Sequence, residues 1–456
     1  MKKNWLLLGI VILLHGLSSC GEDQTEVHLP QPQKTLYTPS RTFLTKAEYH
    51  DKVLGALVGS AIGDAMGVAT EMWNRRDIQR RYGYILGLSP ALTNQSPEGP
   101  WEHNLPPGAT TDDTRWKYLL AKYMVGHKDA INASAFAKFI TDYYQSQTKK
   151  LSDVHIQNHP DSLDAKIENV DWIKEWARVA FSYQEGDIAH QHVGHRFYGG
   201  EMSCAGLLYT PLFGLVAPDT ETAYTLAYEH AIFDIGYARD ISSLASAMCH
   251  MAMHTQNMDS ILNVHAFIDP YQYLDSRLVG RIPHMIARTT ENYALEAMEI
   301  EEIPLTQSLI RNDSITLGRI PTNGVAVMVH KEAIQLRIPK GFPGKDLDWY
   351  RQETIYKNLE RNQRLIAFHA GEIWEILIAG LKFGGGDFET TLQFIINYGR
   401  DNDTVGAVAG MILGAKDGFH QLPEELKTEV LAINRDVLGI DLEALADELT
   451  ELAYPE

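Results

Sequence analysis

Three acidic clusters in the 456-residue chain contain the residue types that bind divalent cations. The first contains Asp64 and Glu71, whose spacing of seven places both on one face of a continuous helix. The second is Thr110-Thr-Asp-Asp-Thr114, and the third is Gly399-Arg-Asp-Asn-Asp-Thr404. Ligation by carboxylate and hydroxyl oxygens suits Mg²⁺, Mn²⁺ or Ca²⁺ rather than Zn²⁺.

The second and third clusters each come directly before an expected helix, where Thr and acidic residues are also favoured as caps. Capping alone explains either cluster by itself. The two together, with Glu71 on a third helix, favour a common site. Carboxylates that converge without cations repel one another strongly, so a pair of divalent ions is the natural compensation.

Two rows of glycine indicate the helices that must position these clusters. Gly55, Gly59, Gly63 and Gly67 recur every fourth residue beside an apolar stripe, and the same spacing recurs near the other end of the chain, at Gly406, Gly410, Gly414 and Gly418. Glycine in a helix costs about 1 kcal/mol relative to Ala, so such a row needs a reason. We predict that each row packs very closely against another backbone at the centre of an all-helical core.

The rest of the body, residues 46–456, reads as one mostly helical domain. Residues 150–168 are polar and interrupt the helical pattern. Residues 303–348 are predicted to be an insertion or lid with a small β-hairpin, because Asn323-Gly324 lies between apolar runs. Helical periodicity is expected at about 114–126, 132–146, 170–183, 201–215, 220–231, 241–254, 350–362, 365–382, 389–398 and 424–452.

The N-terminus reads as an export signal followed by a tether. Residues 1–19 have a basic start and an apolar segment too short to span a bilayer. Leu17-Ser-Ser-Cys20 resembles the lipobox of bacterial lipoproteins, which implies lipidation of Cys20; an ordinary secretory signal is the alternative. Residues 20–45 are acidic and contain three prolines, as in an extended tether. We expect a lipid-anchored protein of the bacterial cell envelope, at the outer membrane, on its periplasmic or surface face.

Composition restricts the partners. The formal net charge is −19, which argues against general binding to nucleic acid and against any membrane contact except through the lipid. A hydrophobic content of 45% excludes a wholly disordered chain. Cys204 and Cys249 are expected to be buried apolar residues rather than a disulfide.

The three clusters, in this order, resemble the motifs of the ADP-ribosylglycohydrolases, which include dinitrogenase reductase-activating glycohydrolase and the ADP-ribosylarginine hydrolases. The family pattern is a Gly-Asp-x3-Gly…Glu helix, then Thr-Asp-Asp-Thr, then Asp-x-Asp-Thr before a Gly/Ala-rich helix. Residues 63–71, 111–114 and 401–404 match it, and the resemblance covers about residues 47–420. It implies an all-α helical bundle around a central metal cleft.

The resemblance also implies two divalent cations, Mg²⁺ in preference to Mn²⁺, and attack on C1 of a ribose by a metal-associated water. A carboxylate must take a proton, and Glu71 or Asp113 is the candidate. Asp64 is expected to be structural and to order a neighbouring loop. The implied metal ligands are Glu71, Thr111, Asp112, Asp113, Asp401, Asp403 and Thr404.

The expected substrate-binding segment departs from the family pattern. In residues 199–214, Ser203 replaces an Asn and Leu207-Leu208 replaces a Met-Arg pair. Residues 233–240 replace a His-containing stretch of the family. The predicted substrate contacts are Gly199, Gly200, Ser203, Trp101 and Tyr198.

The sequence therefore predicts a metal-dependent glycohydrolase that cleaves an N- or O-glycosidic bond at C1 of an ADP-ribosyl or related ribosyl substrate. The alternative is a non-catalytic protein that uses the metals to bind ADP-ribose or a nucleoside at the cell surface. A structural lipoprotein with vestigial sites is the third hypothesis.

Overall fold

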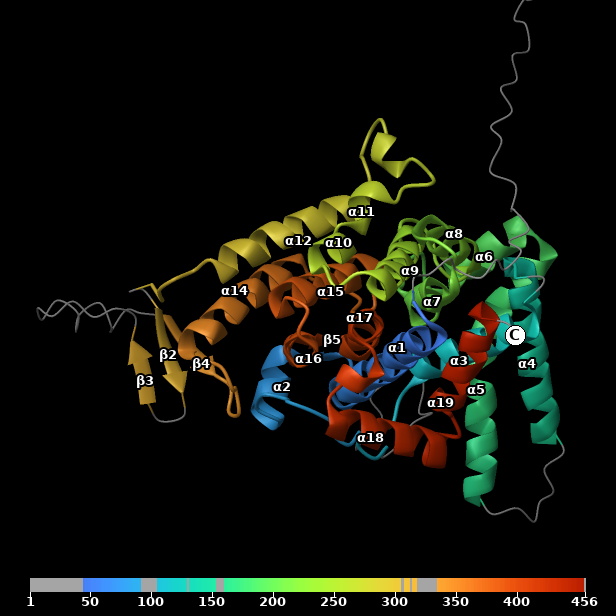
Figure 1. The fold of residues 1–456 in the computed structure, drawn as a ribbon, viewed down its shortest axis with the longest axis horizontal. Helices are drawn as coiled ribbons and strands as arrows, with labels where there is room; N and C mark the ends of the chain where they lie inside the picture. Colours follow the sequence, from blue (N-terminus) through green and yellow to red (C-terminus); the bar gives the residue numbers. More distant parts are fainter. Residues whose placement is uncertain are drawn as a thin grey trace, which may run out of the picture. The chain divides into compact units, whose positions relative to one another are not determined.

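The computed structural model describes residues 44–91, 105–128, 131–152, 160–304, 307–311, 314–317 and 334–454. These residues are mostly helical, which confirms the predicted all-α class (Figure 1). The predictions for the signal peptide, Cys20, most of the tether, Trp101 and Asn323-Gly324 lie outside the described residues. The helices are α1 (Lys46–Gly67), α2 (Arg75–Arg81), α3 (Asp112–Gly126), α4 (Ala133–Ser152), α5 (Pro160–Glu185), α6 (Asp187–Phe197), α7 (Phe213–Val216), α8 (Thr220–His230), α9 (Ala238–His254), α10 (Met258–Leu262), α11 (Val264–Phe267), α12 (Ile282–Met298), α14 (Asp346–Asn362), α15 (Ala370–Gly384), α16 (Phe388–Tyr398), α17 (Asn402–Asp417), α18 (Glu424–Ile433) and α19 (Leu442–Ala453).

The two glycine-striped helices, α1 and α17, pack against each other, as predicted. A Cβ atom added to Gly59 would lie 2.3 Å from the carbonyl oxygen of Gly410, and one on Gly410 would lie 2.0 Å from the carbonyl oxygen of Gly59. Gly63 faces Gly406 in the same way. Since real Cβ atoms do not approach a carbonyl oxygen so closely, only glycine allows this contact between the two backbones.

The glycine contacts also fix the direction and register of the pair. Gly55 meets Gly414, while Gly63 meets Gly406, so the helices run antiparallel. The last glycine of the α1 row, Gly67, contacts the backbone of Asp403. The C-terminal end of α1 therefore meets the N-terminal end of α17, and the first acidic cluster meets the third.

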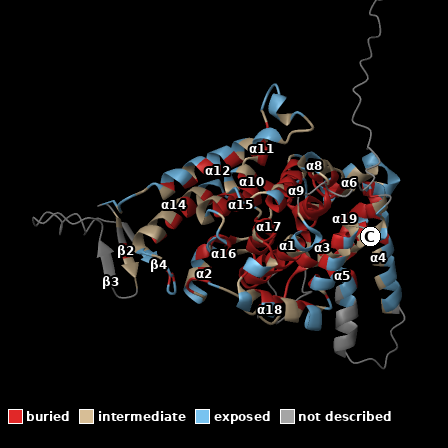
Figure 2. Ribbon diagram, in the orientation of Figure 1, coloured by how far each residue is buried: buried red, intermediate tan, exposed pale blue. Residues whose placement is uncertain are grey.

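Helix α1 is buried along almost its whole length, and the centre of the domain in Figure 2 is red around α1, α17 and α3. Among the described residues, α1 is the single helix long and apolar enough to cross a membrane, and its apolar window is fully buried. Its composition is that of a core helix enclosed by other helices.

A short antiparallel pair of strands joins the chain just beyond α1 to the chain just before α17. Strand β1 (Trp73–Asn74) pairs with β5 (Gly399–Arg400). The N–H of Met72 also donates to the carbonyl oxygen of Arg400 at 2.7 Å. This link holds the segments that follow Glu71 and precede Asp401 side by side.

Several predicted helix boundaries are wrong. Residues 201–215 form two 3₁₀ turns and the short helix α7, because Pro211 lacks the N–H that a continuous helix needs. Residues 424–452 form α18 and α19 with a break at Gly439, whose φ is 70°. Residues 160–168, predicted as part of a polar break, belong to α5, and neither α6 nor α12 was predicted.

The 303–348 region contains a three-stranded sheet, so the predicted β-structure is present there. Strand β2 (Gln307–Arg311) pairs antiparallel with β3 (Ser314–Leu317) and parallel with β4 (Ile334–Ile338). The observed hairpin joins β2 to β3, several residues before the predicted Asn323-Gly324 turn.

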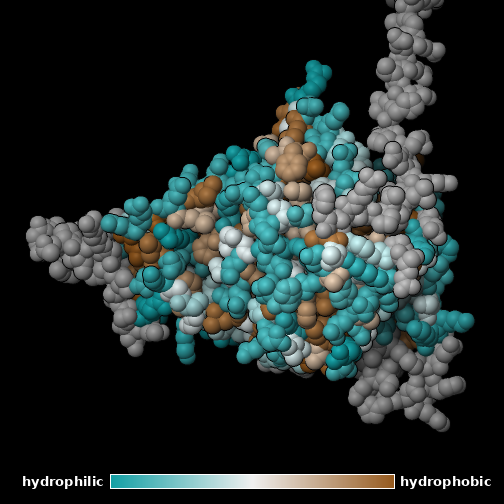
Figure 3. Space-filling view, in the orientation of Figure 1, coloured by the Kyte–Doolittle hydropathy of each residue, from teal (hydrophilic) through white to brown (hydrophobic). Residues whose placement is uncertain are grey.

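Exposed apolar side chains gather from the end of α11 to the loop before α12. They include Phe267, Leu278 and Val279, which are 54%, 95% and 59% exposed. Brown residues mark this segment near the top of Figure 3, on a face that is otherwise largely hydrophilic.

We expect Gly59→Ala to lower the free energy of unfolding by about 1–3 kcal/mol, the range for overpacking, because the new methyl group would overlap Gly410. This loss should exceed the gain of about 1 kcal/mol that Ala brings as a better helix former. The measurement is urea denaturation followed by circular dichroism.

Gly194→Ala in α6 is the matched control, since nothing lies within 4 Å of its added Cβ. It should keep or raise stability, by up to about 1 kcal/mol. Equal stability of the two variants would contradict the proposed role of the glycine contact.

Candidate metal centre

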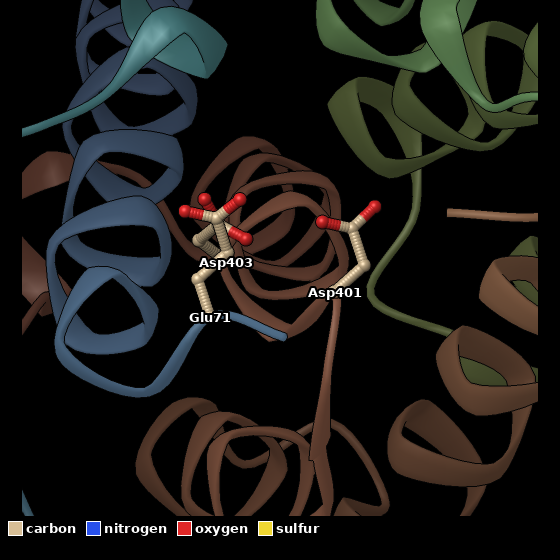
Figure 4. Close-up of side chains that lie close together, drawn as sticks. All are labelled: Glu71, Asp401 and Asp403. Carbon is tan, nitrogen blue, oxygen red and sulfur yellow. The ribbon is translucent and has the colours of Figure 1, made fainter. Parts of the chain in front are cut away.

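Three carboxylates meet at the junction of α1 and α17. One oxygen from each of Glu71, Asp401 and Asp403 lies within 4.8 Å of the others (Figure 4). All three residues are buried, with 8%, 4% and 2% of their surface exposed. Glu71 comes from the turn after α1, and the two aspartates come from the start of α17.

Helix α17 favours anions at this place. Asp401 is its N-cap residue and Asp403 lies in its first turn, where the helix dipole is positive. The amide of Asn402 donates to Thr70 Oγ1 at 2.9 Å, which ties the start of α17 to the turn before Glu71. The backbone thus holds the carboxylates together although their charges repel.

The backbone is strained beside two of the three carboxylates. Met72 follows Glu71 with φ 63°, and Arg400 precedes Asp401 with φ 66°. Left-handed backbone at residues other than glycine costs about 1–3 kcal/mol and is typical of functional sites. Arg400 is held by Glu372, to which its Nε donates at 2.6 Å. The strained residues are therefore the direct sequence neighbours of Glu71 and Asp401.

The electrostatics of the cluster call for a cation. Burial raises the pKa of Asp403 well above its usual value, and the charges of Glu71 and Asp401 raise it further. Within the described part of the chain, Oδ1 of Asp403 is buried with no hydrogen-bond partner. A hard divalent cation would satisfy this oxygen and offset the repulsion, so the residues fit a metal with oxygen ligands.

The second acidic cluster is held by Asp64, which confirms the structural role predicted for that residue. Its carboxylate accepts from the backbone N–H groups of Thr111 and Thr114 and from Thr114 Oγ1 at 2.6 Å. Burial, and after it the charge of Asp113, raise the pKa of Asp64 to about 7, although the hydrogen bond from Thr114 and the charge of Lys117 oppose the shift. Asp64 thus orders the start of α3.

The predicted ligands of this second cluster occupy different positions. Thr111 caps α3 and accepts from the N–H of Asp113. Asp112 lines the same pocket as the three carboxylates. Asp113 is buried, accepts from Thr404 Oγ1 at 2.9 Å and contacts Lys117 Nζ at 3.3 Å. Asp112 therefore faces the pocket, while both oxygens of Asp113 accept from donors on Thr404 and Lys117.

A pocket opens over the three carboxylates. Of the predicted substrate contacts, Tyr198 and Ser203 line it. Gly199 and Gly200 do not: they are exposed residues with φ 62° and 84° that turn the chain after α6. The full lining is Glu71, Met72, Asp112, Trp176, Tyr198, Ser203, Cys204, Ala205, Leu208, Phe368, Asp401, Asp403 and Thr404.

Comparison with known proteins identifies the family. The sequence profile of the ADP-ribosylglycohydrolases matches residues 45–456, nearly the whole described domain. The chain belongs to the ADP-ribosylglycohydrolase family. Members of this family hydrolyse glycosidic bonds, so the protein is a hydrolase of that class.

Two curated relatives of this ADP-ribosylglycohydrolase differ in how much they share with it. The uncharacterized protein YegU of Escherichia coli (strain K12) is 31% identical over 392 residues, which cover 84% of this chain and 93% of YegU. The ADP-ribosyl-[dinitrogen reductase] glycohydrolase of Rhodospirillum rubrum is 33% identical over 79 residues, 17% of this chain and 24% of that enzyme.

Among solved structures, an "ADP-ribosylglycohydrolase-related protein complex" chain has a TM-score of 0.47 and 17% identity. The match covers 89% of this chain and 99% of that chain.

Six pocket residues of this ADP-ribosylglycohydrolase were not among the predicted site residues: Met72, Trp176, Cys204, Ala205, Leu208 and Phe368. Cys204 is buried, and its thiol donates to Asp401 Oδ2 at 3.4 Å. The sequence feature that could have identified Cys204 is its position next to Ser203, in the segment expected to bind substrate. Phe368 comes from the loop before α15, where no sequence motif marks it.

We expect the metal-free protein to carry a stability penalty that grows with pH. Folding raises the pKa of Asp64 and of Asp403, so the folded state favours their protonated forms. Their stabilising contribution to the free energy of unfolding is fully present below the ordinary pKa of 3.8. It is lost as pH rises through the pKa in the folded state, which is about 7 for Asp64. In EDTA, Asp403→Asn should therefore gain unfolding free energy over wild type from about pH 4 to 7.

The exposed Asp171→Asn is the matched control and should show no such gain. A constant difference between Asp403→Asn and wild type across this pH range would contradict the prediction. Denaturant unfolding at each pH gives the measurement.

Proposed function

We propose that this chain is a divalent-metal-dependent glycohydrolase that cleaves an N- or O-glycosidic bond at C1 of an ADP-ribosyl or related ribosyl substrate. The observation that carries the proposal is the buried cluster of Glu71, Asp401 and Asp403 beneath an open pocket. Membership of the family supports it, and the name of the Rhodospirillum rubrum relative supports an ADP-ribosyl group as one substrate.

The metal would be held by the three carboxylates and by Thr404, whose hard oxygens suit Mg²⁺ or Mn²⁺. Of these two ions, the family resemblance favours Mg²⁺. When bound, such a cation supplies Lewis acidity toward substrate hydroxyls and lowers the pKa of a water molecule. Two ions are expected from the resemblance, and Asp112 lines the same pocket as the three carboxylates.

The chain's own carboxylates supply the remaining chemistry. Of the two candidates for taking a proton, Glu71 is preferred, because Glu71 lines the pocket and Asp113 does not. The anionic cluster also stabilises the positive charge that develops on C1 as the glycosidic bond breaks. Asp113 then orients Thr404.

The pocket wall suits a substrate with an apolar or aromatic part near the ribose. Trp176, Tyr198 and Phe368 line the pocket together with Leu208, which replaces a charged residue of the family pattern. A diphosphate would find no cation in that part of the lining. We therefore propose that a ribosyl substrate with an apolar or aromatic part near the ribose is the preferred substrate class.

Anchoring through Cys20 in the bacterial envelope is a further proposal, supported by the lipobox resemblance. If it holds, full-length protein should partition into detergent in a phase-separation assay and Cys20→Ala should remain in water. Equal partitioning of the two forms would contradict lipidation.

We expect Asp403→Ala to lose hydrolysis by more than about 100-fold, since removing a metal ligand should cost at least as much as removing a residue that only orients one. The purified full-length protein would be incubated with Mg²⁺ or Mn²⁺ and a substrate panel. The panel holds ADP-ribosyl-arginine, ADP-ribosyl-serine, O-acetyl-ADP-ribose and nucleosides, and released sugar is read by mass spectrometry.

Asp171→Ala, an exposed acid on α5, should keep wild-type turnover. Full activity of Asp403→Ala would refute the proposed site. A panel compound that binds with metal and is recovered intact would favour the non-catalytic binding protein.

A further inference from the structure

A sulfur atom lies beside the candidate metal centre. The thiol of Cys204 donates to Oδ2 of Asp401 at 3.4 Å, and the residue is 4% exposed. Cys204 lines the same pocket as Glu71, Asp401 and Asp403. The second cysteine in the described part of the chain, Cys249, is also buried but does not line that pocket. The sequence predicts only a buried apolar residue at Cys204, whereas its thiol faces a carboxylate of the cluster.

The backbone holds this sulfur in place. The N–H of Cys204 donates to the carbonyl oxygen of Phe368 at 3.0 Å, and its own carbonyl oxygen accepts from the N–H of Leu207 at 2.8 Å. Just before it, the carbonyl oxygen of Met202 accepts from the N–H of Ala370 at 2.8 Å. Main-chain contacts on both sides therefore fix the thiol beside the start of α17, and a rigid donor of this kind suits a metal site.

The distance from the sulfur to the carboxylate fits two ligands of one ion. A zinc–thiolate bond is about 2.3 Å long and a zinc–carboxylate bond about 2.0–2.2 Å. At ligand angles between about 90° and 110°, the two donor atoms lie about 3.1–3.6 Å apart. The 3.4 Å between Cys204 Sγ and Asp401 Oδ2 is within this range. A thiophilic cation could therefore bind both atoms where they stand.

The cluster offers the remaining donors. One oxygen from each of Glu71, Asp401 and Asp403 lies within 4.8 Å of the other two. Asp403 is 2% exposed, and its Oδ1 has no hydrogen-bond partner among the residues that the structure describes. Three carboxylates and one thiol make four donors, the number that zinc takes in a tetrahedral site.

We propose that Cys204 makes this centre a binding site for thiophilic divalent cations, Zn²⁺ or Cd²⁺, held by its sulfur and by Glu71, Asp401 and Asp403. On binding, the S–H bond breaks, the proton leaves to solvent and a metal–sulfur bond forms. Mg²⁺, a hard ion, leaves the thiol protonated. The inference rests on the proposed function to the extent that the three carboxylates must bind a divalent cation.

The proposed site has a regulatory meaning. Catalytic zinc sites keep one position open for water, whereas sites with four protein ligands are closed. A zinc ion held by three carboxylates and a thiolate has no such open position. Zn²⁺ and Cd²⁺ would therefore compete with the ion that supports hydrolysis and inhibit the enzyme.

The experiment detects the metal–sulfur bond directly. Metal-free full-length protein carrying Cys20→Ala, which removes the third cysteine, is titrated with Cd²⁺, and the ultraviolet charge-transfer band of a cadmium–thiolate bond is recorded. This parent protein should show the band, and Cys204→Ser in the same background should lose it. Cys249→Ser is the matched control, since it removes a buried cysteine outside the pocket, and it should keep the band.

A second variant tests whether the sulfur acts together with the carboxylates. Asp403→Asn should weaken Cd²⁺ binding, followed by the same band, by at least about tenfold, because it removes a ligand of the same ion. The exposed Asp171→Asn should leave the affinity unchanged. Unchanged affinity in Asp403→Asn would place the cadmium outside the centre and overturn the inference.

Absence of the band in the parent, or its persistence in Cys204→Ser, would also overturn the inference. Hydrolysis of the substrate panel with Mg²⁺ would be unaffected by that result, so the proposed function would stand. A band with the expected variant pattern, but no hydrolysis with any metal, would overturn the proposed function instead. If Cys204→Ser fails to fold, as judged by circular dichroism, the cadmium-113 NMR shift of the parent decides whether sulfur is bound.

Discussion

The close contact between α1 and α17 is the constraint on which the rest of the structure depends. Glycine at every fourth position lets the backbones touch, and the pairing of Gly59 with Gly410 and Gly63 with Gly406 sets the register. Because the pair is antiparallel, that register delivers Glu71 to the start of α17. The same contact between α1 and α17 therefore packs the core and assembles the site. A shift of either helix would separate the carboxylates.

The domain opposes the cost of that assembly with local restraints. Repulsion between buried carboxylates and left-handed backbone at Met72 and Arg400 both disfavour the observed geometry. The β1–β5 pair, the Arg400–Glu372 ion pair and the α17 dipole hold it in place. Asp64 does the same for the start of α3 by accepting three hydrogen bonds at once.

The sequence predicted the features for which the presence of a residue type has a single physical explanation. Glycine rows predicted the central helix pair, and carboxylates at helix starts predicted Asp401 and Asp403 as neighbours of Glu71. Tertiary facts were out of reach: Phe368 enters the pocket from a loop without a motif. Residues 201–215 misled the periodicity analysis because apolar residues also line 3₁₀ turns around Pro211.

The burial of α1 has a consequence for biosynthesis. Thr70 and Asn402, which hydrogen-bond across the helix pair, are 332 residues apart. At a translation rate of 5–20 residues per second, α1 waits on the order of tens of seconds for its partner. During that interval an apolar helix long enough to cross a membrane has no α17 to cover it. The contact that covers α1 therefore forms only when synthesis of the chain is nearly complete.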